Sequence, residues 1–327
     1  MNCQDTIINC AQLAGKRLKP SRDIETVQHD DIPYFEMIQK NNQISIKGHQ
    51  YEKHDNAPRM KFFEIALAKE LSGLAYGKAC GNNPLYFNVE LHDTYSYLDK
   101  YNNSMYDNCL VWSKRAGDDK VILLPDLYHL NNFNGKLKYK DKLCWEEKID
   151  KIGFWGTTTG NRNPIKNTRI QTCLWGIPHR EKVDFYITNI AQMTAKDIFL
   201  NVPDFQNIYS SYANDESMLK YKFLLDIPGN TCSWDRVPFV MNSKSLLLKM
   251  PCTDVCFYYP FFKNGTHFVD VNTDNMLSIM TYYMNNPKEA KMITENANYF
   301  VNSYLQQSSA YTYLRTLFQE SIYWNAA

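Results

Sequence analysis

The sequence lacks long apolar runs and a disulfide framework. No apolar run approaches the roughly 18 residues that a membrane-spanning helix needs. The nine cysteines are an odd number and stand singly, unlike the paired cysteines of disulfide-rich secreted domains. The first twenty residues have no apolar core behind a basic start, and the C-terminus, YWNAA, is no retention signal. These absences predict a cytoplasmic protein without a membrane span.

Signals for a metal site and for nucleic-acid binding are also missing. Cys252 and Cys256 are four residues apart, but no second Cys/His pair has zinc spacing, and no D-x-D stands near an expected strand end. Lys and Arg number 36 against 35 Asp and Glu, a net charge of +1, so no basic field is available to hold a polyanion. We expect no metal, no cofactor and no nucleic-acid partner.

The apolar runs that are present are short and alternate with helical patterns, which is typical of an α/β protein with parallel sheets. A chain of 327 residues is long enough for about two domains. Strands are expected at Ile152–Trp155, Val183–Ile187, Phe223–Ile227, Ser245–Lys249 and His267–Val271. Helices are expected near Asn167–Leu174, Trp234–Asn242, Asn275–Tyr283, Pro287–Leu305 and Ala310–Tyr323. We predict an N-terminal domain over 1–148, a C-terminal domain over 149–306, and a last helix, about 307–327, that packs back on the first.

The first polar segment with candidate chemistry follows the expected strand at Ile152–Trp155. It reads GTTTG over Gly156–Gly160 and leads to Arg169. Glycine lets a ligand approach the backbone, and threonine hydroxyls with backbone N–H groups can hold phosphate or sugar oxygens. A guanidinium can pair a phosphate through two parallel hydrogen bonds. The segment is neither a Walker loop nor a G-x-G-x-x-G fingerprint, so an ordinary polar loop is the alternative.

A second polar segment follows the expected strand at Phe223–Ile227. Small polar residues fill Asn230–Asp235 and open a predicted helix. Free N–H groups at such a helix start attract anions, although Ser233 or Asp235 could equally be an ordinary helix cap. A third segment, LYFNVELHD, ends in Glu90 and Asp93 just past a strand. An acid in that position can act as a general base, and a solvated loop acid is the alternative.

Together these segments resemble glycosyltransferase family 90, which includes Rumi-type protein O-glucosyltransferases, capsule xylosyltransferases and bacterial LpsA-like transferases. Over roughly residues 80–305, the resemblance is carried by Asn88–Asp93, Leu123–Tyr128 (LLPDLY), Trp145–Gly160 (WEEKIDKIGFWGTTTG), Asn167–Arg169, Lys220–Trp234 (KYKFLLDIPGNTCSW), Lys244–Lys249 and Phe257–Val271. The sequence departs from the family at Trp155 and Asp235, where arginine is frequent; Arg236 stands one position later.

The resemblance implies the GT-B architecture, in which two Rossmann-like domains face each other across a cleft. It implies an inverting, metal-independent transfer of glucose or xylose from a UDP-sugar to a hydroxyl of a glycan or glycoprotein. Asp93 would be the general base, with Glu90 in reserve. The residues expected to bind the UDP-sugar are Gly156, Thr157, Thr158, Arg169, Asn230, Thr231, Cys232, Ser233, Trp234 and Asp235, and weaker candidates are Asp126, Arg162 and Arg236.

Two other classes remain open. One is a different enzyme, either a GT-B transferase of another family or a sugar-nucleotide epimerase. An epimerase should carry an early glycine fingerprint, which is absent here. The other is a non-catalytic module of the same fold that binds a sugar nucleotide or a glycan. Asp93 argues against that module, because binding alone needs no base.

Overall fold

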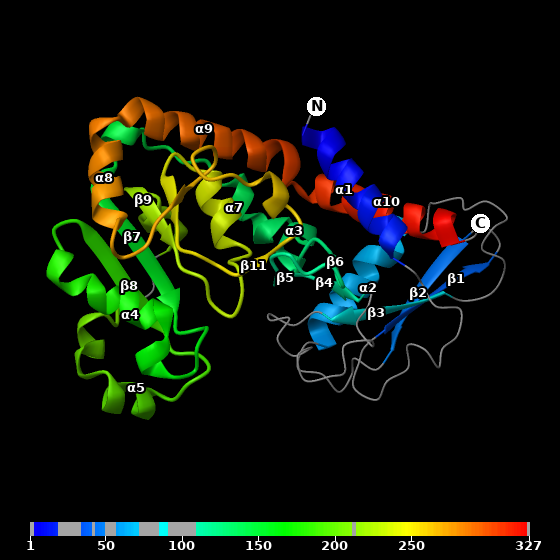
Figure 1. Ribbon diagram of the computed structural model, residues 1–327, viewed down its shortest axis with the longest axis horizontal. Helices are drawn as coiled ribbons and strands as arrows, with labels where there is room; N and C mark the ends of the chain where they lie inside the picture. Colours follow the sequence, from blue (N-terminus) through cyan, green and yellow to red (C-terminus); the bar gives the residue numbers. More distant parts are fainter. Residues whose placement is uncertain are drawn as a thin grey trace. The chain divides into compact units, whose positions relative to one another are not determined.

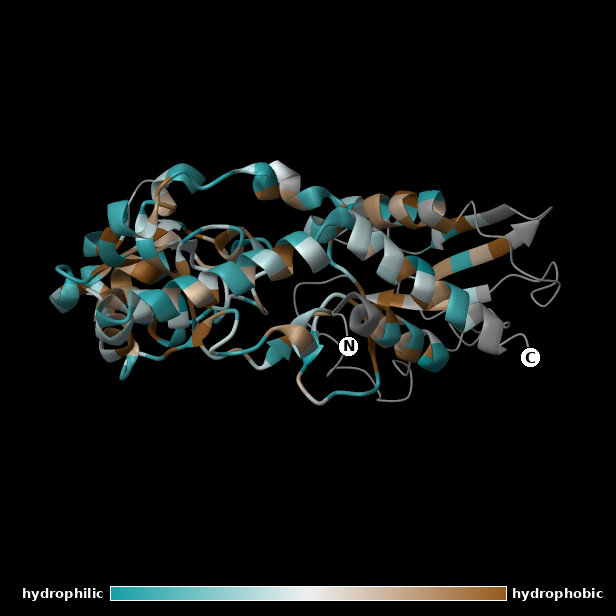
Figure 2. Cartoon of the chain, turned by 90° about the horizontal axis from the view of Figure 1, so that it is seen from above, coloured by the Kyte–Doolittle hydropathy of each residue, from teal (hydrophilic) through white to brown (hydrophobic). Residues whose placement is uncertain are grey.

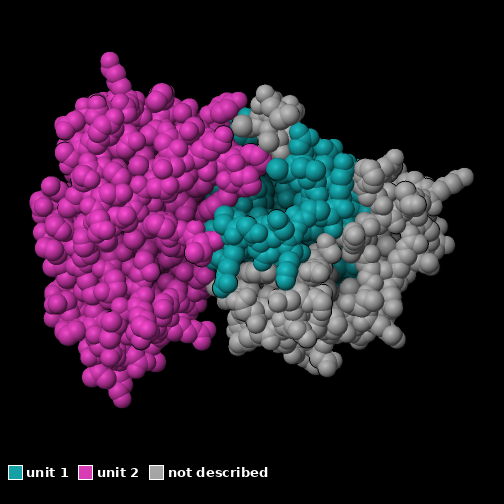
Figure 3. Space-filling view, viewed as in Figure 1, with its two compact units in different colours: residues 1–134, 254–258, 303–327 teal, residues 135–253, 259–302 magenta. Residues whose placement is uncertain are grey.

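A computed structural model describes residues 3–18, 34–40, 43–49, 57–71, 85–90, 109–210 and 214–325. The chain divides into two compact units, coloured separately in Figure 3. Unit 1 comprises residues 1–134, 254–258 and 303–327, and unit 2 comprises residues 135–253 and 259–302. Residues 135–148, which the sequence led us to expect in the N-terminal domain, therefore group with the second unit.

Unit 1 is built on a five-stranded sheet with the strand order β2-β1-β3-β4-β6. Strands β3, β4 and β6 are parallel, as in a Rossmann-like domain, and the antiparallel hairpin β1–β2 extends them on one side. Helix α10 packs along α1 (Figure 1). The elements of unit 1 are α1 (Cys3–Arg17), β1 (Tyr34–Lys40), β2 (Gln43–His49), α2 (Ala57–Leu71), β3 (Leu85–Glu90), β4 (Leu110–Val111), β5 (Lys114–Arg115), β6 (Ile122–Leu123), α3 (Leu127–Leu130), β11 (Asp254–Val255) and α10 (Gln307–Asn325).

Unit 2 is built on a fully parallel five-stranded sheet with the order β12-β10-β9-β7-β8. Each of the five strands expected in the C-terminal half is a strand of this sheet, so the prediction of a parallel α/β domain is confirmed there. The elements of unit 2 are β7 (Ile149–Thr157), α4 (Thr168–Trp175), β8 (Val183–Asn189), α5 (Ala195–Asn201), α6 (Asp215–Met218), β9 (Tyr221–Asp226), α7 (Arg236–Met241), β10 (Leu246–Lys249), β12 (Val269–Asp270), α8 (Met276–Asn285) and α9 (Pro287–Tyr304).

The sheet is buried on its core face by apolar side chains of several helices. Phe154, Phe185 and Phe223 of the strands form one cluster with residues of α4, α5, α8 and α9. Helix α7 packs on β9 and β10 and buries nearly all of its side chains. In Figure 2 the helices carry both apolar residues (brown) and polar residues (teal), as helices with one buried face do. Strands buried in this way read as the continuous apolar runs from which they were predicted.

The strand order creates a switch point between β7 and β9. The chain adds β8 on one side of β7 and then returns to the other side of β7 for β9. In open α/β sheets, ligands bind outside the carboxyl ends of the strands at such a point, because the two following loops diverge there. The loops that follow β7 and β9 are the two polar segments singled out in this half of the sequence.

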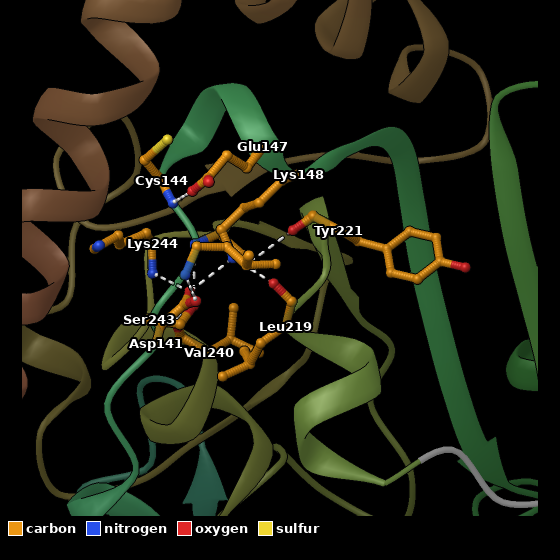
Figure 4. Close-up of polar contacts among 11 residues, drawn as sticks. Asp141, Cys144, Glu147, Lys148, Leu219, Tyr221, Val240, Ser243 and Lys244 are labelled. Atoms are coloured by element: carbon orange, nitrogen blue, oxygen red, sulfur yellow. Dashed lines mark hydrogen bonds and ion pairs between the residues drawn. The ribbon is translucent and has the colours of Figure 1, made fainter.

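A buried lysine fixes the opposite, amino edge of the same sheet (Figure 4). Lys148 directly precedes β7 and is 3% exposed. Its Nζ donates to Asp141 Oδ2 at 2.6 Å, to Ser245 Oγ at 3.1 Å and to the carbonyl oxygen of Leu219. Leu219 precedes β9 and Ser245 precedes β10. One ammonium group just before β7 therefore ties together the starts of three neighbouring strands, two of which end in the polar loops.

Candidate functional site at the switch point

The loops that follow β7 and β9 approach each other through glycine. Gly160 has a φ of 119°, which L side chains rarely adopt. A Cβ built on Gly160 would lie 3.3 Å from the carbonyl oxygen of Gly229. A Cβ on Gly229 would lie 2.7 Å from Thr159 Oγ1 and 3.0 Å from Arg169 Nη2. Both positions therefore need glycine for the loops to come this close.

Arg169, in the first turn of α4, donates hydrogen bonds to both loops. Its Nε and Nη2 donate to the carbonyl oxygen of Ile227, at 3.1 and 2.9 Å. Its Nη1 donates to the carbonyl oxygen of Thr157 at 3.2 Å and to Thr159 Oγ1 at 2.6 Å. The side chain that we expected to hold phosphate is thus also a clamp, which fixes the loop after β7 against the loop after β9.

Arg236, at the start of α7, brings a second guanidinium to the same place. Its Nη2 donates to the carbonyl oxygen of Trp155, and its Cζ lies 4.6 Å from the centre of the Phe154 ring. Burial, together with the positive charge of Arg236, lowers the pKa of Arg169 to about 10, and the charges of Asp226 and Asp235 oppose part of that shift. Neither arginine forms an ion pair with a carboxylate of any described residue. The switch point therefore carries two guanidinium groups that no carboxylate of a described residue contacts.

The nearest acids of unit 2 are occupied by lysines. Asp226 ends β9, is fully buried, and lies 4.0 Å from Lys249 Nζ. Asp235 lies at the start of α7, and its Oδ2 accepts a hydrogen bond from Lys136 Nζ at 3.0 Å. Lys136 is thus the cation beside Asp235, where the family has arginine. Each acid has a lysine as its ion-pair partner, and its charge acts on Arg169 only from a distance.

At two predicted binding positions, Thr158 and Gly156, neighbouring protein atoms fill the space that a side chain would use. Thr158 is fully buried, and its Oγ1 donates to the carbonyl oxygen of Ala191 at 2.8 Å. Gly156 lies inside β7, where a Cβ would meet the Phe154 ring at 2.6 Å. Thr158 and Gly156 shape the loop rather than present polar side-chain atoms at its surface. Thr157 is half-buried, and its carbonyl oxygen accepts a hydrogen bond from Arg169 Nη1.

The predicted residues of the β9 loop differ in how open they are. Thr231, Cys232 and Trp234 are buried, at 6%, 3% and 8% exposure. Ser233 is half-buried, and its Oγ is shielded from solvent without a hydrogen-bond partner among the described residues. A buried hydroxyl without a partner costs free energy, so this atom is suited to receive or donate a hydrogen bond when a ligand arrives.

The remaining candidates belong to unit 1, to an exposed loop of unit 2 or to residues outside the described ranges. Asp93 lies outside the described ranges, and Glu90 is known only as the last residue of β3. Asp126 caps α3 in unit 1, where it is fully buried and its Oδ2 lies 3.0 Å from His129 Nδ1. That setting gives Asp126 a structural place. Arg162 is exposed in the loop that precedes α4.

Three residues of the site did not stand out in the sequence as binding candidates. Asn167 caps α4 and donates from Nδ2 to the carbonyl oxygens of Thr158 and Asn161, both at 2.9 Å. Gln192 follows β8 and accepts a hydrogen bond from the Gly160 N–H at 3.2 Å. Lys136 reaches Asp235 from far along the chain. Asn167 belonged to a quoted motif, but no local signal marks Gln192 or Lys136.

Two kinds of feature are absent from the described ranges, a cluster of metal ligands and a membrane-spanning helix. There, no three His, Cys, Asp or Glu side chains gather as a metal site would require. No helix of the described part has the length and apolar character needed to cross a bilayer.

Comparisons with known proteins complete the description. The sequence model described as "Glycosyl transferase family 90" matches residues 126–323, a range that begins after Asp93. Among solved structures, TarM is 13% identical with a TM-score of 0.41, over 62% of this chain and 42% of that one. Sucrose-phosphate synthase from Thermosynechococcus elongatus is 9% identical with a TM-score of 0.42, over 68% of this chain and 65% of that one. A glycosyltransferase from Rickettsia africae is 14% identical with a TM-score of 0.37, over 68% of this chain and 67% of that one. The chain thus spans less than half of TarM. No curated protein sequence matches it.

Proposed function

Because the chain belongs to glycosyl transferase family 90, we propose that it transfers a sugar from a UDP-linked donor to a hydroxyl group. The donor's diphosphate binds at the switch point of unit 2, and the acceptor is a glycan or a glycoprotein. The transferred sugar is glucose or xylose, with inversion at the anomeric carbon. The reaction needs no metal, since protein cations take up the charge of the leaving group.

The observation that carries this proposal is the pair of arginines without a carboxylate. Arg169 is 8% exposed, and charged side chains are rarely so buried unless they are paired. The hydrogen bonds of Arg169 go to uncharged oxygens, and the charges of Asp226 and Asp235 reach it only from a distance. A diphosphate supplies the missing negative charge. The glycines at 160 and 229 let the two polar loops lie close together beside Arg169.

The chemistry follows from the charges at the two reacting oxygens. As the anomeric bond breaks, negative charge grows on the departing UDP, and fixed donors stabilise it without reorganising. Arg169, Arg236 and the Ser233 hydroxyl are the donors assigned to that task. The acceptor oxygen attacks from the opposite side and loses its proton to Asp93, the general base inferred from the family resemblance. Loss of one such donor typically raises the barrier by about 3–4 kcal/mol.

The first experiment tests the donor site. Purified protein is titrated with UDP, with GDP and with uridine in the presence of EDTA, by isothermal calorimetry. We expect UDP to bind without metal and uridine to bind much more weakly, because uridine lacks the diphosphate. Equal affinity for UDP and uridine would refute the placement of the diphosphate beside the arginines.

The second experiment tests the base. Transfer from UDP-glucose and UDP-xylose is measured for Asp93→Asn and for the control Asp119→Asn, whose side chain is 88% exposed. The first variant should lose transfer and keep UDP binding, and the control should keep both. A fully active Asp93→Asn variant would remove Asp93 from the mechanism. A wild-type chain that binds UDP and transfers from no donor would favour the non-catalytic binding module instead.

A further inference from the structure

The backbone N–H of Gly160 is held by two side chains from other loops. It donates to Asn230 Oδ1 at 3.0 Å and to Gln192 Oε1 at 3.2 Å. Asn230 belongs to the loop after β9 and Gln192 to the loop after β8, so this one donor lies where three loops meet. Shared between two neutral amide oxygens, it forms two partial bonds rather than one strong bond.

Gln192 holds this position with an uncommon backbone. Its φ is 67°, in the left-handed region that is costly for residues other than glycine. Such a conformation persists only where its surroundings impose it. Among the described residues its side chain forms a hydrogen bond with the Gly160 N–H, and the residue is otherwise exposed. Its freed amide would therefore be hydrated at once, so giving up the bond costs little.

An anionic oxygen is a better acceptor for the same N–H than an amide oxygen is. Hydrogen bonds to ionised acceptors are shorter and roughly twice as strong as those between neutral groups. Gly160 follows the threonines whose Thr157 carbonyl and Thr159 hydroxyl are held by Arg169, so the positive charge of the site lies beside it. A diphosphate oxygen that enters there can replace Gln192 on the Gly160 N–H.

We propose that Gln192 sets the affinity for the donor by occupying the Gly160 N–H until the diphosphate displaces it. Gln192 is thus a positioning residue that competes with the donor, and its role rests on the proposed function. Removing its side chain strengthens the binding of UDP and leaves the binding of uridine unchanged, because uridine carries no competing anion.

The test uses the full chain and three variants. Gln192→Ala removes the amide and keeps a non-glycine residue with the same backbone demand. Gln192→Glu keeps the acceptor and adds a negative charge beside the diphosphate. Gln206→Ala, at another exposed glutamine of unit 2, is the matched control. Calorimetry gives the Kd of each for UDP and uridine, and turnover with the UDP-sugar gives KM and kcat.

For Gln192→Ala we expect a Kd for UDP roughly two- to tenfold lower than that of the wild type, the range spanned by one neutral hydrogen bond. The donor KM should fall with it while kcat stays the same. Gln192→Glu should raise the Kd for UDP, roughly tenfold, and the control should match the wild type.

Three results would overturn the proposal: an unchanged Kd for UDP in Gln192→Ala, a higher Kd for UDP in that variant, or an equal change in the Kd values for UDP and uridine. The second of these would mean that Gln192 contacts the donor directly. If the wild type itself failed to bind UDP, both this inference and the proposed function would fall. If the wild type binds UDP and only the Gln192→Ala prediction fails, the proposed function stands alone.

Discussion

Removal of Asp141 should destabilise unit 2 more than removal of Lys148, although the two form one ion pair. In Asp141→Ala the buried ammonium of Lys148 keeps two of its three hydrogen-bond acceptors among the described residues, Ser245 Oγ and the Leu219 carbonyl oxygen. Breaking a buried pair so that a charge is left uncompensated costs about 3–5 kcal/mol. In Lys148→Met the Asp141 carboxylate keeps two backbone donors, the N–H of Leu143 at 3.2 Å and of Lys244 at 2.9 Å. That variant should lose about 1–3 kcal/mol.

The pH dependence gives this prediction a second, independent readout. Burial lowers the pKa of Lys148, and the hydrogen bond and charge of Asp141 oppose that shift. Without Asp141 the folded-state pKa falls further below the unfolded value of about 10.4. In the interval between the two pKa values the unfolded state binds more protons, so stability rises with pH. The wild type gains stability in the same way, but only from its own, higher folded-state pKa upward. The deficit of Asp141→Ala should therefore be full below the folded-state pKa of the variant and shrink as the pH rises toward that of the wild type.

The assay is urea unfolding of wild type, Asp141→Ala, Lys148→Met and the double variant, followed by near-UV circular dichroism from pH 7 to pH 9.5. The double variant should be more stable than the sum of the single losses predicts, because neither partner is left as a lone buried charge. Equal losses for the two single variants, or a deficit of Asp141→Ala that does not change with pH, would refute the reasoning.

Three further predictions concern the switch point. Arg169→Met should weaken UDP binding by about 2–5 kcal/mol in calorimetry, with little change for uridine; an equal loss for both ligands would contradict it. Gly229→Ala should destabilise the chain by about 1–3 kcal/mol and weaken UDP binding, since the new Cβ would press on Thr159 and Arg169; wild-type thermal stability would show that the loops yield. Asn167→Ala should cost about 0.5–2 kcal/mol of stability in urea unfolding through loss of the α4 cap, and a cost near zero would mean that water replaces the cap.

The strands of unit 2 could be predicted because each is a continuous apolar run between polar residues. A strand buried on both faces has no alternation to obscure it, as the fully buried Leu246–Lys249 shows. The two polar loops were also visible, since glycine and threonine stand where strands end. What the sequence does not contain is the order of the strands. That order makes β7 and β9 neighbours, and so brings Thr157 and Ile227 within reach of one arginine.

The contacts that sequence reasoning missed are those made across long separations. Gln192 reaches Gly160 because the fold places the loop after β8 beside the loop after β7. Lys136 reaches Asp235 because its segment, well before β7 in the sequence, lies at the start of α7. An exposed glutamine in a loop has no pattern of its own, and its left-handed backbone is not written in its residue type. Thr158 shows the limit of residue type in the other direction, because threonine suits a ligand while this hydroxyl already donates to the carbonyl oxygen of Ala191 and accepts from its N–H.

The two arginines also bear on why the site is built as it is. If Arg169 served only to join two loops, pairing it with Asp226 would lower the free energy of the empty protein, since Asp226 is near enough to affect its pKa. Instead Asp226 lies beside Lys249, and Arg169 donates its hydrogen bonds to uncharged oxygens. Carbonyl and hydroxyl oxygens fix the guanidinium without cancelling its charge. The field of Arg169 and Arg236 is therefore preorganised before any ligand binds, which is the condition under which charge stabilisation lowers a reaction barrier most.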